Sequence, residues 1–169
     1  HTVKIANGGV SSTTFVGSAS GTSTLIINDT SLNSSGFAGN LGGAGANENK
    51  IGLTIDTGGS TFYWTGAANT YTGPTQILSG KLAIGPSNGG TGGRLSPSTA
   101  VSISSGATLL FNNNGGSYSG AVANSISGAG VLQLGSGTLT LTGSSSYSGG
   151  TVLQSNGSPG GAGGSGFIV

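Results

Sequence analysis

The ionisable residues are the first candidates for chemistry in this chain, and they are few. The chain has three carboxylates, four lysine or arginine residues and one histidine. They are Asp29, Glu48, Asp56, Lys4, Lys50, Lys81, Arg94 and His1. General acid–base catalysis usually needs a histidine or two carboxylates held close together. Because the three carboxylates fall in separate segments, we predict no catalytic residues and no enzymatic activity.

A metal or cofactor site also finds little support in these residues. The segment from Gly42 to Asn49 superficially resembles a calcium-binding nonapeptide, but it lacks the Asp that this pattern requires. Calcium prefers several oxygen ligands, carboxylates among them. The absence of cysteine removes thiolate and disulfide chemistry. We therefore expect a polar loop at 42–49, and neither a metal nor a cofactor.

The composition excludes two classes of partner. Only 4% of the residues are charged, against about 25% in ordinary globular proteins. A nucleic-acid binder needs a basic surface, so we expect no nucleic-acid partner. No apolar run approaches the roughly 18 residues of a membrane helix, so we do not expect a membrane-spanning chain. A mean hydropathy of +0.13 with alternating apolar residues favours ordered β structure over disorder.

The elements that would position any site are short strands with one buried face. Between Gly128 and Gln154, leucines fall two apart at 132 and 134 and again at 139 and 141. This is the period of a half-buried β-strand. The same alternation predicts that Phe62 and Trp64 face the core. The other inward positions that we predict are Leu82, Ile84, Val101, Ile103, Leu109, Leu132, Leu134, Leu139 and Leu141.

The residue pattern in the N-terminal third of the chain predicts further strands on both sides of one irregular segment. Strands are expected at 2–5, 13–16, 24–27 and 51–55, where β-formers cluster or alternate. Residues 31–49 are rich in Gly, Asn and Ser, and we expect a long loop or a bulge there.

One motif occurs twice. Tyr71, Gly73, Thr75 and Ile77 match Tyr147, Gly149, Thr151 and Leu153 at an offset of 76 residues (147 − 71). An internal repeat in a Gly-, Ser- and Thr-rich chain favours a solenoid over a closed globule. The alternative is an antiparallel β-sandwich, because the Gly135–Gly137 spacer is short enough for a hairpin.

These motifs together resemble a known repeat. The segments G-T-L-T-L-T-G and Y-S/T-G-G-T, with Leu95 to Ile103 and Gly106 to Leu109 between the copies, are similar to the autotransporter-associated β-strand repeat of bacterial surface proteins. The resemblance covers roughly residues 60–155. Pro74 departs from it by replacing the second glycine of the motif. The resemblance implies a right-handed parallel β-helix, exported, processed and displayed outside the cell or on its surface.

We expect one β-solenoid domain over residues 1–157, with the repeat region at 51–155, and a glycine-rich tail at 158–169 that ends in an apolar tip. A solenoid has open strand edges at its ends, and open edges invite another copy. We predict that both ends of the chain make assembly contacts, with the tail folded back along its own solenoid as the alternative. The predicted contact residues are Thr2, Val3, Lys4, Ile5, Phe167, Ile168 and Val169.

The function that follows is structural. We expect a self-associating β-solenoid that forms a surface fibre, stalk or matrix filament, with copies of itself as the partner. The alternative is an adhesin or glycan-binding passenger module, in which residues 31–49 and 86–94 would contact surface glycans.

Overall fold

The computed structural model describes residues 2–5, 14–17, 20–30, 36–85, 93–111, 118–154 and 167–168. These residues form strands joined by turns and irregular segments, and none of them is helical. The strands are β1 (Thr2–Ile5), β2 (Ser23–Ile27), β3 (Gly36–Phe37), β4 (Ile51–Trp64), β5 (Thr75–Ile84), β6 (Val101–Ile103), β7 (Thr108–Phe111), β8 (Tyr118–Val122), β9 (Ile126–Gly128), β10 (Val131–Leu134), β11 (Gly137–Leu141), β12 (Thr151–Leu153) and β13 (Phe167–Ile168).

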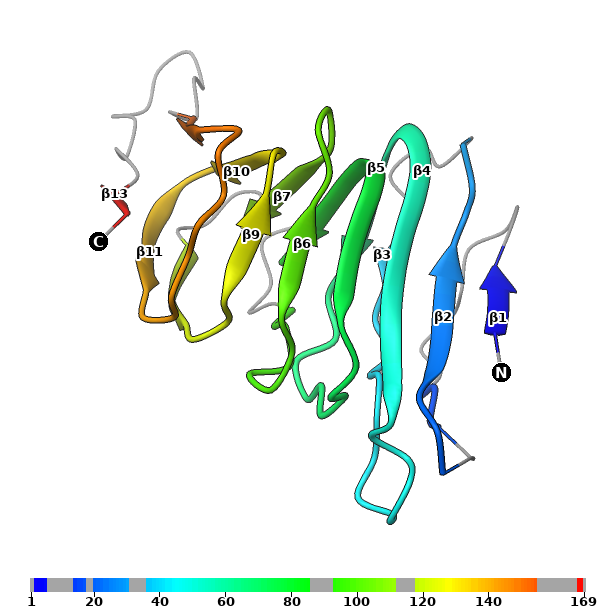
Figure 1. The fold of residues 1–169 in the computed structure, drawn as a ribbon. Helices are drawn as coiled ribbons and strands as arrows, with labels where there is room; N and C mark the ends of the chain where they lie inside the picture. Colours follow the sequence, from blue (N-terminus) through cyan, green and yellow to red (C-terminus); the bar gives the residue numbers. More distant parts are fainter. Residues whose placement is uncertain are drawn as a thin grey trace.

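The first face of the molecule is a ladder of parallel strands. It runs from β1 through β2, β4, β5 and β6 to β9, and Figure 1 shows it advancing from the N-terminal end toward the C-terminal end. Partners in adjacent strands are 22 residues apart for Leu53 and Thr75 and 28 apart for Leu25 and Leu53. The chain therefore returns to the same face once per coil, as a β-solenoid does. Every pairing of the described strands is parallel, so the antiparallel alternative is wrong.

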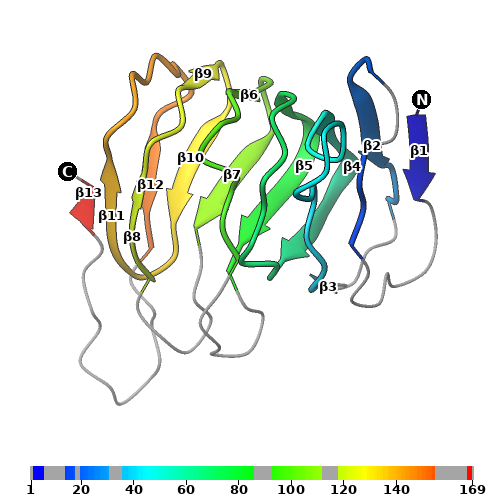
Figure 2. The same ribbon diagram turned by 90° about the horizontal axis from the view of Figure 1, so that it is seen from below.

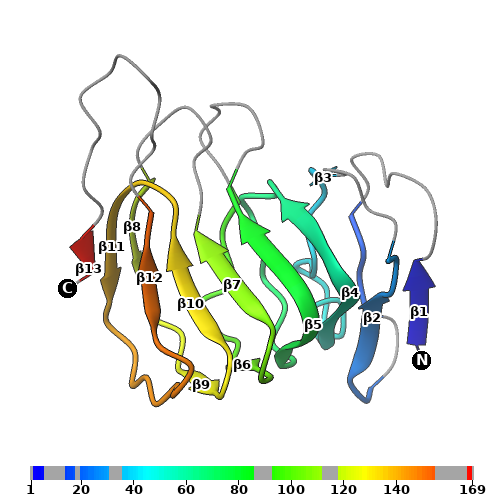
Figure 3. The same cartoon turned by 90° about the horizontal axis from the view of Figure 1, so that it is seen from above.

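The second face is a ladder that shares two long strands with the first. It runs from β3 through the second halves of β4 and β5 to β7, β10 and β12 (Figure 3). β4 turns the corner between the faces at Gly58 and Gly59, whose φ values are 65° and 137°, and β5 turns it at Gly80 with φ 71°. Glycine adopts this left-handed backbone without the steric cost that a Cβ brings.

The third face is regular only toward the C-terminal end, where β8, β11 and β13 pair (Figure 2). Phe167 and Ile168 of β13 lie beside Thr138 and Leu139 of β11 in the same chain. The structure thus shows the fold-back arrangement for these two residues. Within the described residues, β13 pairs with β11 alone, so contact of its other edge with a second copy stays a prediction.

The core is built from columns of side chains that stack from coil to coil. Ile27, Ile55, Ile77 and Ile103 occupy one column, and all four are buried. The predicted inward positions are confirmed as buried, except that Leu141 is only partly buried. The register explains the exception. On the side away from β8, β13 reaches only as far as Leu139 and leaves Leu141 uncovered by its described residues.

The segment predicted as a long loop at 31–49 contributes to the core where the structure describes it. Phe37 lies in β3, and both Phe37 and Leu41 are buried. Phe37 contacts Phe15 on one side and Trp64 on the other, with ring centroids 5.6 and 6.3 Å apart. Trp64 in turn stacks on Tyr71 at 5.7 Å. The core assignment of Phe62 and Trp64 is confirmed. In the segment expected to be a long loop or a bulge, Phe37 lies in a short strand and Leu41 in an isolated bridge, and the other residues of 38–49 are turns or irregular.

The two copies of the repeated motif lie on different faces. Thr75 of the first copy pairs with Leu53 and Val101 in the first ladder, whereas Thr151 of the second copy pairs with Leu132 in the second ladder. The 76-residue offset is therefore not a whole number of coils. Each copy of the motif forms a corner followed by a strand, and this unit occurs on the first face in one copy and on the second face in the other.

The motif glycine permits close approach of two coils. A Cβ on Gly73 would lie 2.7 Å from both the Gly52 nitrogen and the Ile51 oxygen, and one on Gly149 would lie 2.1 Å from the Gly130 oxygen. The following position differs between the copies. Gly150 has φ 86°, a value that proline cannot adopt, so the chain takes a different path at Pro74.

Replacing Gly73 by Ala should destabilise the chain by about 1–3 kcal/mol, because the new methyl group meets main-chain atoms of the adjacent coil that move only if the coils separate. Gly21→Ala is the matched control, since a Cβ there has nothing within 4 Å. Urea denaturation followed by circular dichroism measures both. Equal stability of the two variants would contradict the close contact between coils.

Candidate functional site

The repeated tyrosine and threonine form the same hydrogen bond in both copies of the motif. The Tyr71 hydroxyl lies 2.7 Å from Thr75 Oγ1, and the Tyr147 hydroxyl lies 2.7 Å from Thr151 Oγ1. Tyr71 is buried and Tyr147 is half-buried. A motif that repeats one internal hydrogen bond on two faces has a structural role, since a ligand site would not need both copies.

The hydrogen bonds around Tyr71 have one consistent direction. Thr99 Oγ1 donates to the Gly73 carbonyl at 2.7 Å, so it is free to accept from Thr75 Oγ1 at 3.2 Å. Thr75 then accepts from the Tyr71 hydroxyl. The chain of bonds runs from Tyr71 to Gly73 and crosses to the next coil at Thr99, and the Ser96 backbone of that coil also contacts the Tyr71 hydroxyl. These bonds hold the motif against its neighbouring coil.

Burial raises the pKa of Tyr71 above its ordinary value of 10.0, and the hydrogen bond with Thr75 offsets part of that rise. The reason is that the phenolate would be charged in a site without water. The neutral phenol is therefore the form that the folded chain holds.

The carboxylate of Asp56 joins three successive coils at one corner. It accepts a hydrogen bond from Asn28 Nδ2 at 3.0 Å and another from Ser79 Oγ at 2.6 Å. Ser79 Oγ also accepts from the Gly58 amide at 2.8 Å. Both carboxylate oxygens are engaged by coil-to-coil bonds, so Asp56 supports the corner between the first and second faces.

Three other charged side chains, those of Glu48, Lys50 and Lys81, form hydrogen bonds with neutral groups. Glu48 Oε2 accepts from the Gly45 amide at 2.8 Å and closes the turn there. Lys50 Nζ donates to the Ser20 carbonyl at 3.2 Å, and Lys81 Nζ to Gln133 Oε1 at 3.4 Å. In the part of the chain that the structure describes, no three His, Cys, Asp or Glu residues lie close enough to hold a metal ion.

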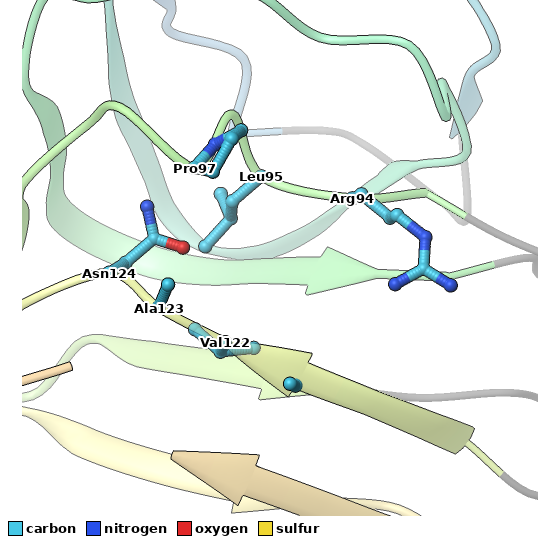
Figure 4. Close-up of a pocket in the computed structure, with 7 residues that line it drawn as sticks. Arg94, Leu95, Pro97, Val122, Ala123 and Asn124 are labelled. Atoms are coloured by element: carbon cyan, nitrogen blue, oxygen red, sulfur yellow. The ribbon is translucent and has the colours of Figure 1, made fainter. Parts of the chain in front are cut away.

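A groove opens in the third face, between the coil of residues 93–97 and β8 (Figure 4). Its volume is about 220 Å³. Seven residues line it: Arg94, Leu95, Pro97, Ala121, Val122, Ala123 and Asn124. No backbone hydrogen bond joins residues 93–97 to β8 among the described residues, so the ladder is interrupted at this point. The groove places polar and apolar groups side by side.

Two of these residues give the groove its polar character. Asn124 is only 4% exposed, and its Nδ2 donates to the Ser96 carbonyl at 2.7 Å and to the Thr99 carbonyl at 2.8 Å. Arg94 is exposed and lies at the opposite end of the groove in Figure 4. The loops at 31–49 and 86–94 that the sequence suggested for glycan contact overlap this groove at Arg94 alone. Residues 31–35 and 86–92 lie outside the described part.

The predicted assembly residues sit at the two ends of the molecule. Thr2, Val3, Lys4 and Ile5 form β1, which pairs with β2, and Phe167 and Ile168 form β13. Val169 and His1 lie outside the described residues. The structure thus separates the predicted contacts into two opposite edges and tests neither as a contact with another copy (Figure 1).

A further end strand was missed by the sequence analysis. Val152 and Leu153 of β12 are 44% and 50% exposed, whereas their partners Gln133 and Leu134 one coil earlier are 6% and 0% exposed. Within the described residues β12 pairs with β10 alone. Among the described residues no further coil covers this pair, and the sequence pattern alone gives the same inward assignment to Leu134 and Leu153.

Comparison with known families gives one match. Residues 52–84 and 131–158 match the model of the passenger-associated transport repeat. The chain contains two passenger-associated transport repeats. The first spans β4 and β5, and the second includes β10, β11 and β12. The resemblance inferred from the sequence is confirmed, and the repeat type is that of exported passenger regions. Neither a search of curated proteins nor a search of solved structures found a match.

No helix in the described part of the chain is long and apolar enough to cross a membrane.

Tyr71 gives the fold a dependence on alkaline pH. The unfolded tyrosine ionises near pH 10, whereas the folded one stays neutral to higher pH. The contribution of Tyr71 to the free energy of unfolding is therefore complete below about pH 10. It is lost as the pH rises beyond that, by at most about 1.4 kcal/mol per pH unit. Urea titrations between about pH 9 and pH 11.5 should show a shallower loss of stability in Tyr71→Phe than in the wild type. Parallel curves for the two proteins would show that Tyr71 does not titrate with folding.

Proposed function

We propose that this chain is a structural segment of an exported, extracellular or surface-displayed protein, and that it associates end to end with copies of itself into a fibre, stalk or filament. The passenger-type repeats support export, and the solenoid supports growth along one axis. The proposal includes the absence of catalysis. Hydrogen bonds engage the carboxylate of Asp56 at a corner and that of Glu48 in a turn, which supports this part of the proposal.

The observation that carries the proposal is the exposed apolar pair on β12. Leu153 continues the column of Trp64, Ile84, Phe111 and Leu134, and those four are buried because the next coil covers each of them. Leu153 is 50% exposed, and no further coil covers it among the residues that the structure describes. Burying a leucine side chain fully is worth roughly 1.5–3 kcal/mol, so a second copy placed over β12 gains stability from it.

The backbone of the end strands adds a directional interaction. β1 at one end and β12 and β13 at the other each pair on one edge only within the described residues. Parallel strand addition to such an edge satisfies main-chain N–H and C=O groups that otherwise bind water. Two unlike ends that meet head to tail along the solenoid axis generate an open filament, since stacking along one axis does not close into a ring.

The low charge of the chain favours the same association. A content of 4% charged residues leaves little repulsion between two approaching ends. Natural edge strands usually carry charged side chains that prevent such pairing. The described residues of β12, Thr151, Val152 and Leu153, carry none.

Leu153→Asp tests the proposal, with Leu78→Asp as the matched control. Leu78 is a similarly exposed leucine at 47%, but it lies on β5 in the middle of the solenoid. Leu153→Asp should weaken self-association by at least about tenfold, because it replaces a buried apolar contact by a charge at the joint. Leu78→Asp should associate as the wild type does. Sedimentation velocity gives the association, and negative-stain microscopy shows the fibres.

Two results would count against end-to-end assembly through β12. One is a folded wild-type chain that stays monomeric at every accessible concentration. The other is an equal loss of association in both leucine variants, which would place the contact on the lateral faces.

A further inference from the structure

The groove in the third face contains a side-chain acceptor, Asn124 Oδ1, for which the described residues provide no donor. The Nδ2 atom of Asn124 faces two main-chain carbonyl oxygens, so the assignment of nitrogen and oxygen in its carboxamide is fixed by chemistry. The remaining atom, Oδ1, accepts no hydrogen bond within the described part of the chain. Figure 4 shows it turned toward Leu95, inside the groove.

Asn69 is a second asparagine with similar contacts, and both its carboxamide nitrogen and its carboxamide oxygen are hydrogen-bonded. Asn69 Nδ2 also donates to two carbonyls, those of Gly66 and Arg94, at 2.9 and 2.7 Å. Its Oδ1, however, accepts the Leu41 amide at 2.7 Å. Asn69 is therefore complete, whereas Asn124 is held in place by its donors while its acceptor is presented to the groove. This acceptor opens onto the groove (Figure 4), where a ligand hydroxyl or amide can donate to it in place of solvent.

Arg94 supplies the opposite kind of group. Its main-chain N–H and C=O are used in coil contacts with Gly66 and Asn69, which fix its position in the coil. Its guanidinium forms no hydrogen bond or ion pair with the residues that the structure describes. A guanidinium offers paired donors that fit a carboxylate. Acceptor and cation thus lie at the two ends of one groove.

The surface between these groups is apolar. Leu95 and Val122 are buried, and Pro97, Ala121 and Ala123 are exposed. A volume of about 220 Å³ is below the roughly 300–1,000 Å³ of sites for drug-sized ligands, so the groove suits one small ring. An inserted peptide strand does not fit, because the direct bond from Asn124 to Ser96 holds the two coils together at one end of the groove.

We propose that this groove binds a single carboxylated sugar unit, such as a uronic acid residue of an acidic glycan. The sugar carboxylate pairs with Arg94, a ring hydroxyl donates to Asn124 Oδ1, and the apolar face of the ring rests on Leu95, Pro97 and Val122. Charge complementarity selects an acidic sugar, since Arg94 is the charged residue that lines the groove. The inference is independent of end-to-end assembly because the groove lies between two coils of the third face, away from β1 and β12.

The test uses glucuronic acid, glucose and acetate added separately to isotopically labelled full-length chain, with amide chemical shifts as the readout. Glucuronic acid should shift the signals of residues 94–97 and 121–124, including the side-chain amide of Asn124. It should bind at least about tenfold more tightly than glucose, which lacks the carboxylate, and than acetate, which lacks the ring.

Three variants separate the contributions. Arg94→Gln should remove the preference of glucuronic acid over glucose. Ala123→Phe should block both sugars by filling the groove while Arg94 stays in place. Lys50→Gln is the matched control, because it removes a surface cation outside the groove and should change nothing.

Two outcomes would overturn the proposal. One is a folded chain whose signals at 94–97 and 121–124 do not respond to glucuronic acid. The other is acetate binding as tightly as glucuronic acid with no effect of Ala123→Phe, which would show that Arg94 attracts any anion and that the groove has no part in recognition.

Discussion

The fold depends on the parallel contact between each coil and the one before it. Strands in a ladder lie about 4.8 Å apart. At that distance a residue that faces the adjacent coil either has no side chain, as glycine does, or stacks its side chain on the equivalent residue of that coil. Gly73 and Gly149 show the first case, since a Cβ on either would meet main-chain atoms of the neighbouring coil. The isoleucine column of 27, 55, 77 and 103 shows the second.

The same contact explains how the polar residues are used. Equivalent corner positions of successive coils lie next to each other. A polar side chain at one corner can therefore form a hydrogen bond with the corner of the adjacent coil. Asp56 bonds to Asn28 and Ser79 in this way, and Thr99 bonds to Gly73. Such bonds engage both oxygens of the Asp56 carboxylate and the hydroxyl of Thr99. Asn124 is different because its donors are consumed and its acceptor is not, and it lies where the third-face ladder is interrupted.

Stacking also determines what the ends of the molecule offer. An inward residue is buried only if a coil covers it, which is why Leu134 is inaccessible and Leu153 is half-exposed although they share a column. The end of a solenoid thus exposes apolar side chains that face the core and backbone groups that have no strand partner. One more coil would bury the side chains and pair the backbone groups. We propose that a second copy supplies that coil. A lateral groove such as the one at Arg94 arises differently, from irregular backbone between two coils.

The alternation of apolar residues by itself determined which side chains face the core, as Leu82, Val101, Leu109 and Leu132 show, because the side-chain period of a strand is local. The repeated motif determined the solenoid class and the passenger-type relationship. Only the tertiary structure decided which strands pair. A Gly-Ser-Gly spacer is compatible with either a hairpin or a corner, and the choice depends on the neighbouring coil. The same reason explains why the second motif copy lies on the second face, why Phe37 and Leu41 are core residues in a segment of loop-like composition, and why Leu141 is left partly uncovered. The groove also needed the structure, because Arg94 and Asn124 come together only through the register of two coils.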